Sequence, residues 1–185
     1  MNLPSKLGLI YLVSEVALQY LRRSGSRART ADAGSLAVLW ITIGAGMIGG
    51  IVVALTVPRF GFSLPRAATQ FIGPVFVGGL VLRWWAIISL GRFFTVDVAI
   101  AADHELIVRG PYHLMRHPSY TGLMLAFAAL AVTLQNWLSL VCVLVPISLA
   151  LAYRIYVEEI ALEATFGDAY RNYAATTKRL IPGLF

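Results

Sequence analysis

Long apolar runs separated by short polar segments give this chain its pattern. The first run covers residues 7–21 with Glu15 inside it, the second is Ser35–Val57, and the third is Phe71–Leu90. Ser35–Val57 carries no charge and reaches the roughly 20 residues that a helix needs to cross a bilayer. Two prolines in the segment PRFGFSLPR then end this helix. The pattern predicts three transmembrane helices in residues 1–90.

A fourth run, Tyr120–Tyr153, contains no charged residue. As one helix it would be about 50 Å long at roughly 1.5 Å per residue, which exceeds the thickness of a bilayer. The polar pair Gln135–Asn136 therefore predicts a turn that makes this run a helical hairpin. Helical spacing continues beyond it through YRIYVEEIALEATFG, and Gly167 is the expected stop. We expect an all-α integral membrane protein with about five transmembrane helices, the last two a hairpin.

The composition agrees with a membrane protein. Hydrophobic residues make up 58% of the chain and its mean hydropathy is +0.75, whereas soluble domains are about 45–50% apolar. Positive charges follow the first run instead of preceding it, which favours a retained helix over a signal peptide. We expect one membrane domain over residues 1–185, with three N-terminal helices in 1–90 and a cofactor-binding catalytic half in 91–185.

The net charge of +6 does not indicate a nucleic-acid partner, because the basic residues lie at the ends of apolar runs. The loop at residues 22–34 holds four Arg, and five spans would place it on one side with residues 91–120 and the C-terminal tail. The positive-inside rule makes that side cytoplasmic. We expect a multi-pass protein of the inner or plasma membrane, in contact with membrane lipids, whose site faces the cytoplasm. No protein partner is predicted.

Glycines in the second run match the spacing G-x-G-x-x-G at Gly44, Gly46 and Gly49. That spacing indicates a dinucleotide only where it follows a strand and opens a helix in a βαβ unit. Inside an apolar span, Gly46 and Gly50 instead favour close helix packing. Arg83 interrupts the third run beside two tryptophans; it either faces a partner or snorkels to the headgroups, and we favour snorkelling.

Histidine and cysteine give no metal site. His113 and His117 are four residues apart, but Pro118 disfavours helical geometry at His117 and no third ligand lies nearby. The single cysteine, Cys142, lies in an apolar run, so no disulfide framework is expected.

The densest polar cluster is RGPYHLMRHPSYTG, residues 109–122, directly before the fourth run. Composition alone makes it an interfacial loop that contacts headgroup phosphates. Three segments, LGRFFTVDV, HELIVRGPYHLMRHPSYTG and EEIALEATFGDAYRNYAATTKRLIP, together resemble the C-terminal signature of the isoprenylcysteine carboxyl methyltransferase family. The resemblance covers about residues 90–182. One departure is His113, where the family often has Arg.

The resemblance implies an integral membrane enzyme that transfers a methyl group from S-adenosylmethionine (SAM), with a pocket formed by the last two helices and the polar segments around them. Arg116 and His117 suit the carboxylate of SAM, and tyrosines suit its adenosine and sulfonium. The expected cofactor-binding residues are Gly110, Tyr112, Arg116, His117, Pro118, Tyr120, Tyr170, Tyr173, Arg179 and Pro182.

The expected catalytic residues are Arg154, Glu158 and Glu159. A carboxylate acceptor needs a cation and no base; Arg154 is the first candidate, and Glu158, four residues on, either orients it or forms an ordinary helix-end ion pair. For a thiol or amine acceptor, Glu158, Glu159 or His117 would be the base.

We expect the acceptor to be a lipophilic molecule that enters from the bilayer, most simply an isoprenylcysteine-like carboxylate. A phospholipid amine or a small thiol stays open, because phospholipid methyltransferases share the Arg-His-Pro and Glu-Glu elements. Two other classes are a sterol-reductase-like NADPH oxidoreductase, which the length of 185 residues argues against, and a non-catalytic membrane protein.

Overall fold

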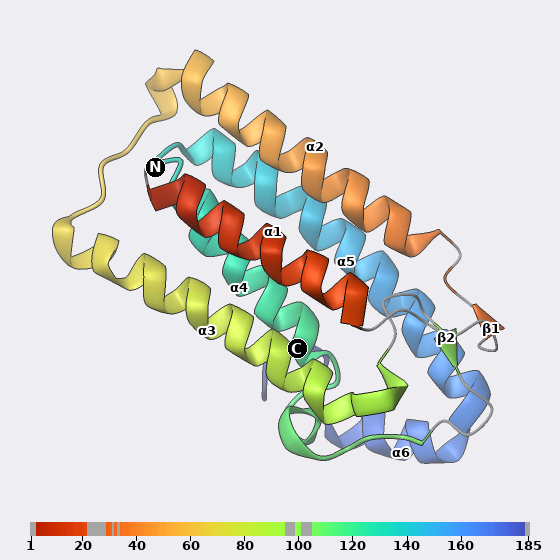
Figure 1. Ribbon diagram of the computed structural model, residues 1–185. Helices are drawn as coiled ribbons and strands as arrows, with labels where there is room; N and C mark the ends of the chain where they lie inside the picture. The colour runs from red at the N-terminus through yellow and green to blue at the C-terminus, as the bar shows by residue number, and fades with distance from the viewer. Residues whose placement is uncertain are drawn as a thin grey trace.

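The computed structural model describes residues 3–21, 29–30, 32, 34–94, 99–100 and 105–183. Five helices form a bundle and a sixth, shorter helix follows at one end (Figure 1). The helices are α1 (Leu3–Leu21), α2 (Ser35–Thr56), α3 (Arg66–Leu90), α4 (Pro118–Val132), α5 (Trp137–Phe166) and α6 (Asp168–Thr176). Short elements join them: the 3-10 helices η1 (Pro58–Phe60), η2 (Gly91–Phe93) and η3 (Gly110–His113), and the antiparallel strands β1 (Arg29–Thr30) and β2 (Ala99–Ile100).

The prediction of a helical membrane protein is confirmed. Within the described residues, α2, α3 with its continuation to Phe93, and α5 are long and apolar enough to cross a membrane. α4 is apolar but has 15 residues, and α1 carries Lys6 and Glu15. The count of five spans therefore stays a prediction. So does the cytoplasmic orientation, since most of the Arg-rich loop at 22–34 lies outside the described residues.

The predicted turn at Gln135–Asn136 and the stop at Gly167 are confirmed, whereas the first helix of the hairpin begins two residues before the predicted run. α4 starts at Pro118, where a proline at the first helical position loses no hydrogen bond. The turn follows α4: Gln135 has a left-handed φ of 50°, and the Asn136 side chain accepts a hydrogen bond from the Ser139 N–H (3.1 Å). α5 ends at Gly167, whose φ is 51°.

Small residues let the helices approach closely in two places. A Cβ on Gly79 of α3 would lie 2.6 Å from the carbonyl oxygen of Gly122 on α4, so these two backbones are in contact. On α2, Gly46 and Gly50 face α5, where the carbonyl of Gly50 accepts a hydrogen bond from the Ser139 hydroxyl (2.7 Å). The packing interpretation of Gly46 and Gly50 is therefore confirmed.

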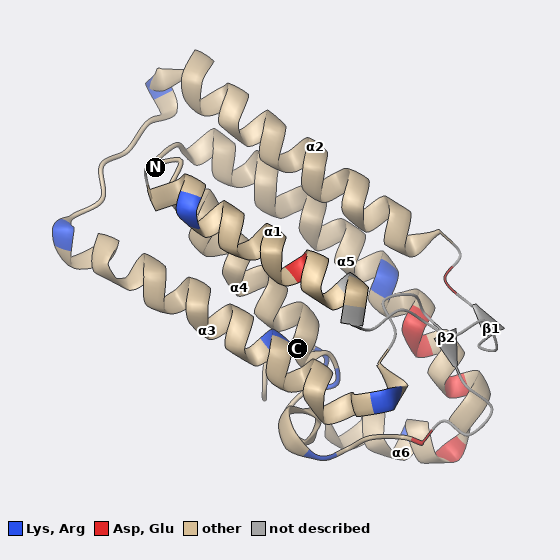
Figure 2. Ribbon diagram, in the orientation of Figure 1, with Lys and Arg blue, Asp and Glu red and all other residues tan. Residues whose placement is uncertain are grey.

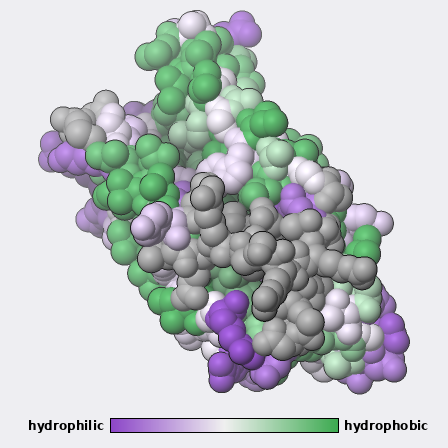
Figure 3. All heavy atoms as spheres, turned by 45° about the vertical axis from the view of Figure 1, so that its right-hand side comes forward, coloured by the Kyte–Doolittle hydropathy of each residue, from purple (hydrophilic) through white to green (hydrophobic). Residues whose placement is uncertain are grey.

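Apolar side chains cover the outside of the bundle as well as its core. Phe76, Val143 and Ile147 are fully buried, whereas Leu55 and Ile41 on α2 are more than two-thirds exposed. Figure 3 shows hydrophobic surface along the helices, with most of the hydrophilic surface at the margins of the view. Figure 2 shows few charged residues along the helices and a concentration near α6. This distribution suits a bundle surrounded by lipid.

Replacing Gly79 by Ala tests the contact between α3 and α4. The new methyl group has no room, and overpacking of this kind costs about 1–3 kcal/mol. The neighbouring Gly78 meets open space, so Gly78→Ala should be neutral or stabilising by up to about 1 kcal/mol. Thermal unfolding of both variants in detergent measures the difference; equal unfolding temperatures would contradict the close approach.

Candidate active site

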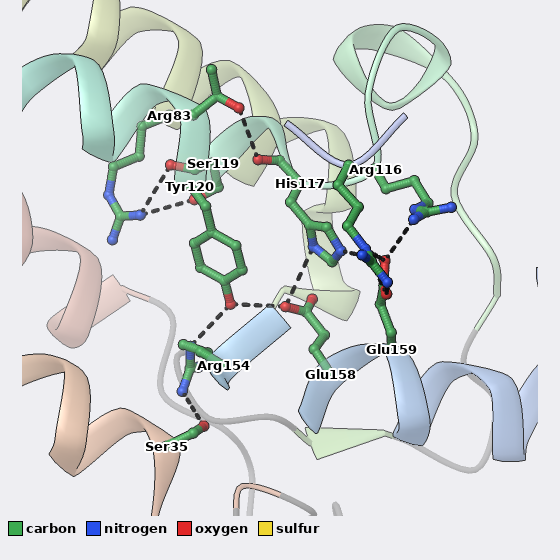
Figure 4. A network of polar contacts seen from close by, with 11 residues as sticks. Ser35, Arg83, Arg116, His117, Ser119, Tyr120, Arg154, Glu158 and Glu159 are labelled. Atoms are coloured by element: carbon green, nitrogen blue, oxygen red, sulfur yellow. Dashed lines mark hydrogen bonds and ion pairs between the residues drawn. The ribbon is translucent and has the colours of Figure 1, made fainter. Parts of the chain in front are cut away.

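One carboxylate on α5, that of Glu159, gathers cationic side chains from two distant segments (Figure 4). Its Oε1 lies 3.0 Å from Arg116 Nη2 and 3.2 Å from His117 Nε2. Its Oε2 accepts a hydrogen bond from Arg179 Nη2 at 2.8 Å. Arg116 and His117 precede α4, and Arg179 lies in the C-terminal segment. The structure thus joins four of the predicted site residues around a single charge.

Backbone hydrogen bonds fix the two segments side by side. The N–H groups of Arg116 and His117 donate to the carbonyls of Lys178 (2.8 Å) and Arg179 (2.9 Å). The Arg116 guanidinium also donates to the carbonyl of Ala174 at 2.8 Å. The segment at residues 177–180 therefore forms one wall of the cluster, as its place in the sequence signature implies.

A second group of contacts runs from α5 through Tyr120. Arg154 Nε donates to the Tyr120 hydroxyl at 2.9 Å, and this hydroxyl donates to Glu158 Oε2 at 2.8 Å. Because an arginine can only donate, the Tyr120 proton must point toward Glu158. The His117 ring stacks on Tyr120, with centroids 5.6 Å apart, and its Nδ1 lies 3.7 Å from Glu158. The expected relation between Arg154 and Glu158 is thus bridged by a tyrosine.

The remaining predicted tyrosines contact one another through η3 and α6. The Tyr173 hydroxyl donates to the carbonyl of Tyr112 at 2.6 Å, and the Tyr170 and Tyr173 rings meet edge to face at 6.3 Å. Burial raises the pKa of Tyr112 well above its ordinary value, that of Tyr173 to about 12, and that of Tyr170 as well. All three hydroxyls are therefore protonated donors at neutral pH.

The other residues discussed in the sequence analysis differ in their burial and in their contacts. Gly110 has a φ of 62°, and a Cβ there would lie 2.8 Å from Ser89 Oγ, so glycine lets the loop pack on the end of α3. Pro118 is fully buried at the start of α4. Pro182 is exposed, and no contact in the described structure joins it to the cluster. His113 is also exposed.

The snorkelling interpretation of Arg83 is wrong. Arg83 is 8% exposed and pairs with Glu15 on α1 through two bonds, Nε to Oε1 at 2.7 Å and Nη2 to Oε2 at 2.9 Å. Its Nη1 donates at 2.9 Å to the Oγ of Ser119, the residue that precedes Tyr120. In the sequence, Glu15 and Arg83 carry opposite charges and each interrupts an apolar run. This pattern could have indicated that they pair, since a buried charge requires a partner.

Asp32 and Ser35 were not predicted either. Arg154 Nη1 donates to Asp32 Oδ1 at 2.8 Å and to Ser35 Oγ at 3.0 Å. In the sequence, an Asp shortly before an apolar run indicates a helix N-terminus, but nothing links it to a residue on α5.

A small cavity of about 40 Å³, open on one side to the surface, adjoins Tyr120 on the side facing the helices. Its polar end is formed by Glu15, Arg83, Ser119, Tyr120 and Arg154, and its apolar wall by Leu36, Leu39, Trp40 and Ile43 of α2, with Leu18, Phe94 and Leu123. The first 90 residues therefore contribute to the site together with the second half of the chain.

The polar cluster retains hydrogen-bonding capacity for a polar ligand. Within the described part of the chain, four buried side-chain atoms have no hydrogen-bond partner, and two of them, Arg116 Nε and the Tyr170 hydroxyl, belong to the polar cluster. Both belong to residues predicted to bind SAM, whose carboxylate and adenosine accept hydrogen bonds. The residues present thus fit that cofactor. Among the described residues, no group of three or more His, Cys, Asp or Glu side chains has the arrangement of a metal site.

A bundle of apolar helices with a polar cluster at one end and a cavity beside it defines a membrane protein with an enclosed site. The chain matches the isoprenylcysteine carboxyl methyltransferase (ICMT) family over residues 71–164, just over half of its length, and it belongs to that family.

Relatives agree with this family. The chain is 37% identical to protein-S-isoprenylcysteine O-methyltransferase B of Arabidopsis thaliana over 56% of its length and 54% of that protein. It is 31% identical to a protein-S-isoprenylcysteine O-methyltransferase of Dictyostelium discoideum over 66% and 53%. Among solved structures, the eukaryotic intramembrane Ras methyltransferase ICMT matches with a TM-score of 0.60 and 26% identity, over 78% of this chain and 52% of that one. The chain spans about half the length of these relatives.

Glu159→Gln tests the central charge of the cluster. The amide keeps the size of the side chain but leaves Arg116, His117 and Arg179 without their carboxylate, so the free energy of unfolding should fall by about 1–3 kcal/mol. Glu163→Gln on the same helix is the matched control, because its pair with Arg171 is about half exposed and should matter little. Thermal unfolding without ligand compares the two; similar small shifts would contradict the central role of Glu159.

Proposed function

We propose that this protein is a membrane-embedded, SAM-dependent methyltransferase that esterifies the carboxylate of a lipophilic, isoprenylcysteine-like acceptor. One observation carries the proposal: Tyr120 belongs both to the polar cluster and to the cavity with the apolar wall. A charged cofactor on the cluster side of Tyr120 and an apolar acceptor on its cavity side can therefore lie next to each other. The names of the relatives support the same reaction.

SAM supplies an electrophilic methyl group on a sulfonium. Arg116, with Arg179 beside it, supplies positive charge and donors for its carboxylate, His117 offers its ring nitrogens, and the protonated hydroxyls of Tyr112 and Tyr170 supply further donors. These side chains are largely held in place by Glu159 and by the backbone pairing with residues 178–179. Such prior ordering lowers the cost of alignment, which dominates an in-line displacement.

The acceptor carboxylate is already a nucleophile, so methyl transfer to it needs alignment and exclusion of water more than a base. Arg154 and Tyr120 lie at the polar end of the cavity, where they can hold that carboxylate near the cluster. The four residues of the α2 wall extend over about 10 Å of helix, at roughly 1.5 Å per residue, and suit an apolar tail. For an amine or thiol acceptor, Glu158 would be the proton acceptor, since its carboxylate is 30% exposed beside Tyr120.

Binding and transfer assays on the purified protein test the reaction. His117→Ala and Tyr120→Ala should each weaken SAM binding about tenfold or more, because each removes charge-assisted contacts at the cluster. His113→Ala is the matched control, since this histidine is exposed, and should bind SAM as the wild type does. Unchanged binding in His117→Ala would refute the site, and binding of NADPH instead of SAM would refute the class.

The acceptor chemistry is read from the same reaction with methyl-labelled SAM and N-acetyl-S-farnesylcysteine. A methyl ester releases its label as methanol in alkali, whereas a methylated amine or thioether keeps it. Alkali-stable label in a lipid extract, with none on the farnesylcysteine, would favour the amine or thiol alternative.

Ile43→Phe should narrow the apolar end of the cavity. Ile43 is 7% exposed and is the lining residue of α2 that lies farthest from the start of this helix. The KM for a farnesyl acceptor should rise about tenfold, equivalent to roughly two methylenes no longer buried, while that for a short-tailed acceptor changes little. Ile41→Phe, which faces outward on the same helix at 71% exposure, should leave both KM values unchanged. Equal effects of the two variants would contradict the tail position.

A further inference from the structure

Arg154 is held by residues from the opposite end of the chain. Its Nη1 donates to Asp32 and Ser35 at the start of α2, at 2.8 and 3.0 Å. Arg154 lies inside the family match at residues 71–164, whereas Asp32 and Ser35 lie outside it. The carboxylate that binds the Arg154 guanidinium directly therefore comes from the N-terminal segment.

Asp32 is itself fixed by the first turn of α2. Its Oδ1 accepts from the Ser35 hydroxyl at 2.9 Å, its Oδ2 from the Leu36 N–H at 3.1 Å, and its carbonyl from the Ser35 N–H at 2.8 Å. A helix N-terminus stabilises a carboxylate. Burial alone raises the pKa of Asp32. The hydrogen bonds from Leu36 and Ser35 and the charge of Arg154 together lower the pKa by more than burial raises it, so the net shift is downward. Asp32 is therefore a rigid, ionised partner at neutral pH.

Two anchors set the orientation of the guanidinium. Nη1 is held by α2, and Nε donates to the Tyr120 hydroxyl at 2.9 Å. A long side chain tethered only to its own helix would sample several rotamers, and ordering it costs free energy. With Nη1 fixed, Nε faces Tyr120, and the Tyr120 proton is directed to Glu158.

We propose that Asp32, assisted by Ser35, is a positioning residue of the acceptor site, which orients Arg154 and through it Tyr120. This inference rests on the proposed function for its kinetic consequences. It assigns Asp32 and Ser35, next to the first turn of α2, a role in the reaction. The orientation of the Arg154 guanidinium is then set before an acceptor binds.

Two other roles for Asp32 give different outcomes. If Asp32 merely occupied the place of the acceptor carboxylate, its removal would free Arg154 and lower the KM for the acceptor. If Asp32 only capped α2, asparagine would replace it without loss, because Asn is as good a cap as Asp. Asp32→Asn therefore separates the three roles, since it keeps the cap and removes the charge.

For Asp32→Asn we expect kcat with N-acetyl-S-farnesylcysteine to fall about tenfold or more, the effect of weakening one charge-assisted hydrogen bond that orients the site. SAM affinity should stay as in the wild type, whereas the unfolding temperature should fall, because the buried Arg154 loses its charged partner. Ser35→Ala, which keeps the charge of Asp32, should show a smaller loss. Asp168→Asn is the matched control, because it removes the carboxylate of an exposed pair with Arg171, and it should leave kcat unchanged.

A readout on the ligand-free protein makes the test independent of activity. In ¹⁵N spectra of the arginine side chains, the Nε–H groups of Arg154 and Arg83 should both exchange slowly with water, since both are hydrogen-bonded and buried. Arg154→Lys identifies the first signal. Asp32→Asn should speed exchange at Arg154 and leave Arg83 unchanged, as an internal control.

Each outcome decides the proposal. An unchanged Arg154 signal with unchanged kcat would overturn it, as would a lower acceptor KM in Asp32→Asn. A fall in kcat and in unfolding temperature with an unchanged Arg154 signal would mean that Asp32 acts through the stability of the fold and not by orienting Arg154, and would overturn it as well. If the wild type neither binds SAM nor transfers methyl, the proposed function fails, while the Arg154 signal still decides whether Asp32 positions this arginine.

Discussion

Two buried arginines are the constraint around which this bundle is organised. A guanidinium between membrane helices is costly unless a carboxylate and further hydrogen bonds compensate it, and removing one partner leaves an unpaired charge. Arg83 finds its carboxylate on α1 and Arg154 finds one at the start of α2. The N-terminal helices are thus tied to α3 and α5 by charge, in a membrane where apolar contact alone drives little association.

The same two arginines also position the residues at the start of α4. Arg83 reaches Ser119 and Arg154 reaches Tyr120, so adjacent residues at the start of α4 are held from opposite sides. Pro118 begins that helix, and His117 just before it joins the cluster around Glu159. The positions of these side chains therefore depend on helices far away in the sequence.

Local patterns in the sequence were sufficient for five of the six described helices, although α1, α3 and α4 begin before the predicted runs and α6 was not predicted. The uncharged run at Tyr120–Tyr153 broke at Gln135–Asn136 as predicted, because polar turn residues are recognisable without tertiary information. The pair of Glu15 and Arg83 was not predictable in the same way. Hydropathy shows that each charge interrupts a run, but not which helices are neighbours or which faces meet. The contact of Asp32 with Arg154 spans 122 residues and depends wholly on packing. The number of spans is open for a related reason: Lys6 and Glu15 lower the hydropathy of α1, and only the fold shows that Glu15 is neutralised by Arg83.

The consecutive carboxylates of α5 show how one helix serves two environments. Adjacent residues on an α-helix point about 100° apart, so Glu158 and Glu159 cannot face the same partners. Glu158 turns to Tyr120, beside the cavity, and Glu159 turns to Arg116, His117 and Arg179. His117 lies between them, with one ring nitrogen 3.7 Å from Glu158 and the other 3.2 Å from Glu159. The Glu-Glu pair is therefore the point where the polar cluster and the apolar cavity share a boundary. Both carboxylates therefore face His117, whose ring stacks on Tyr120, and the Tyr120 hydroxyl in turn accepts a hydrogen bond from Arg154.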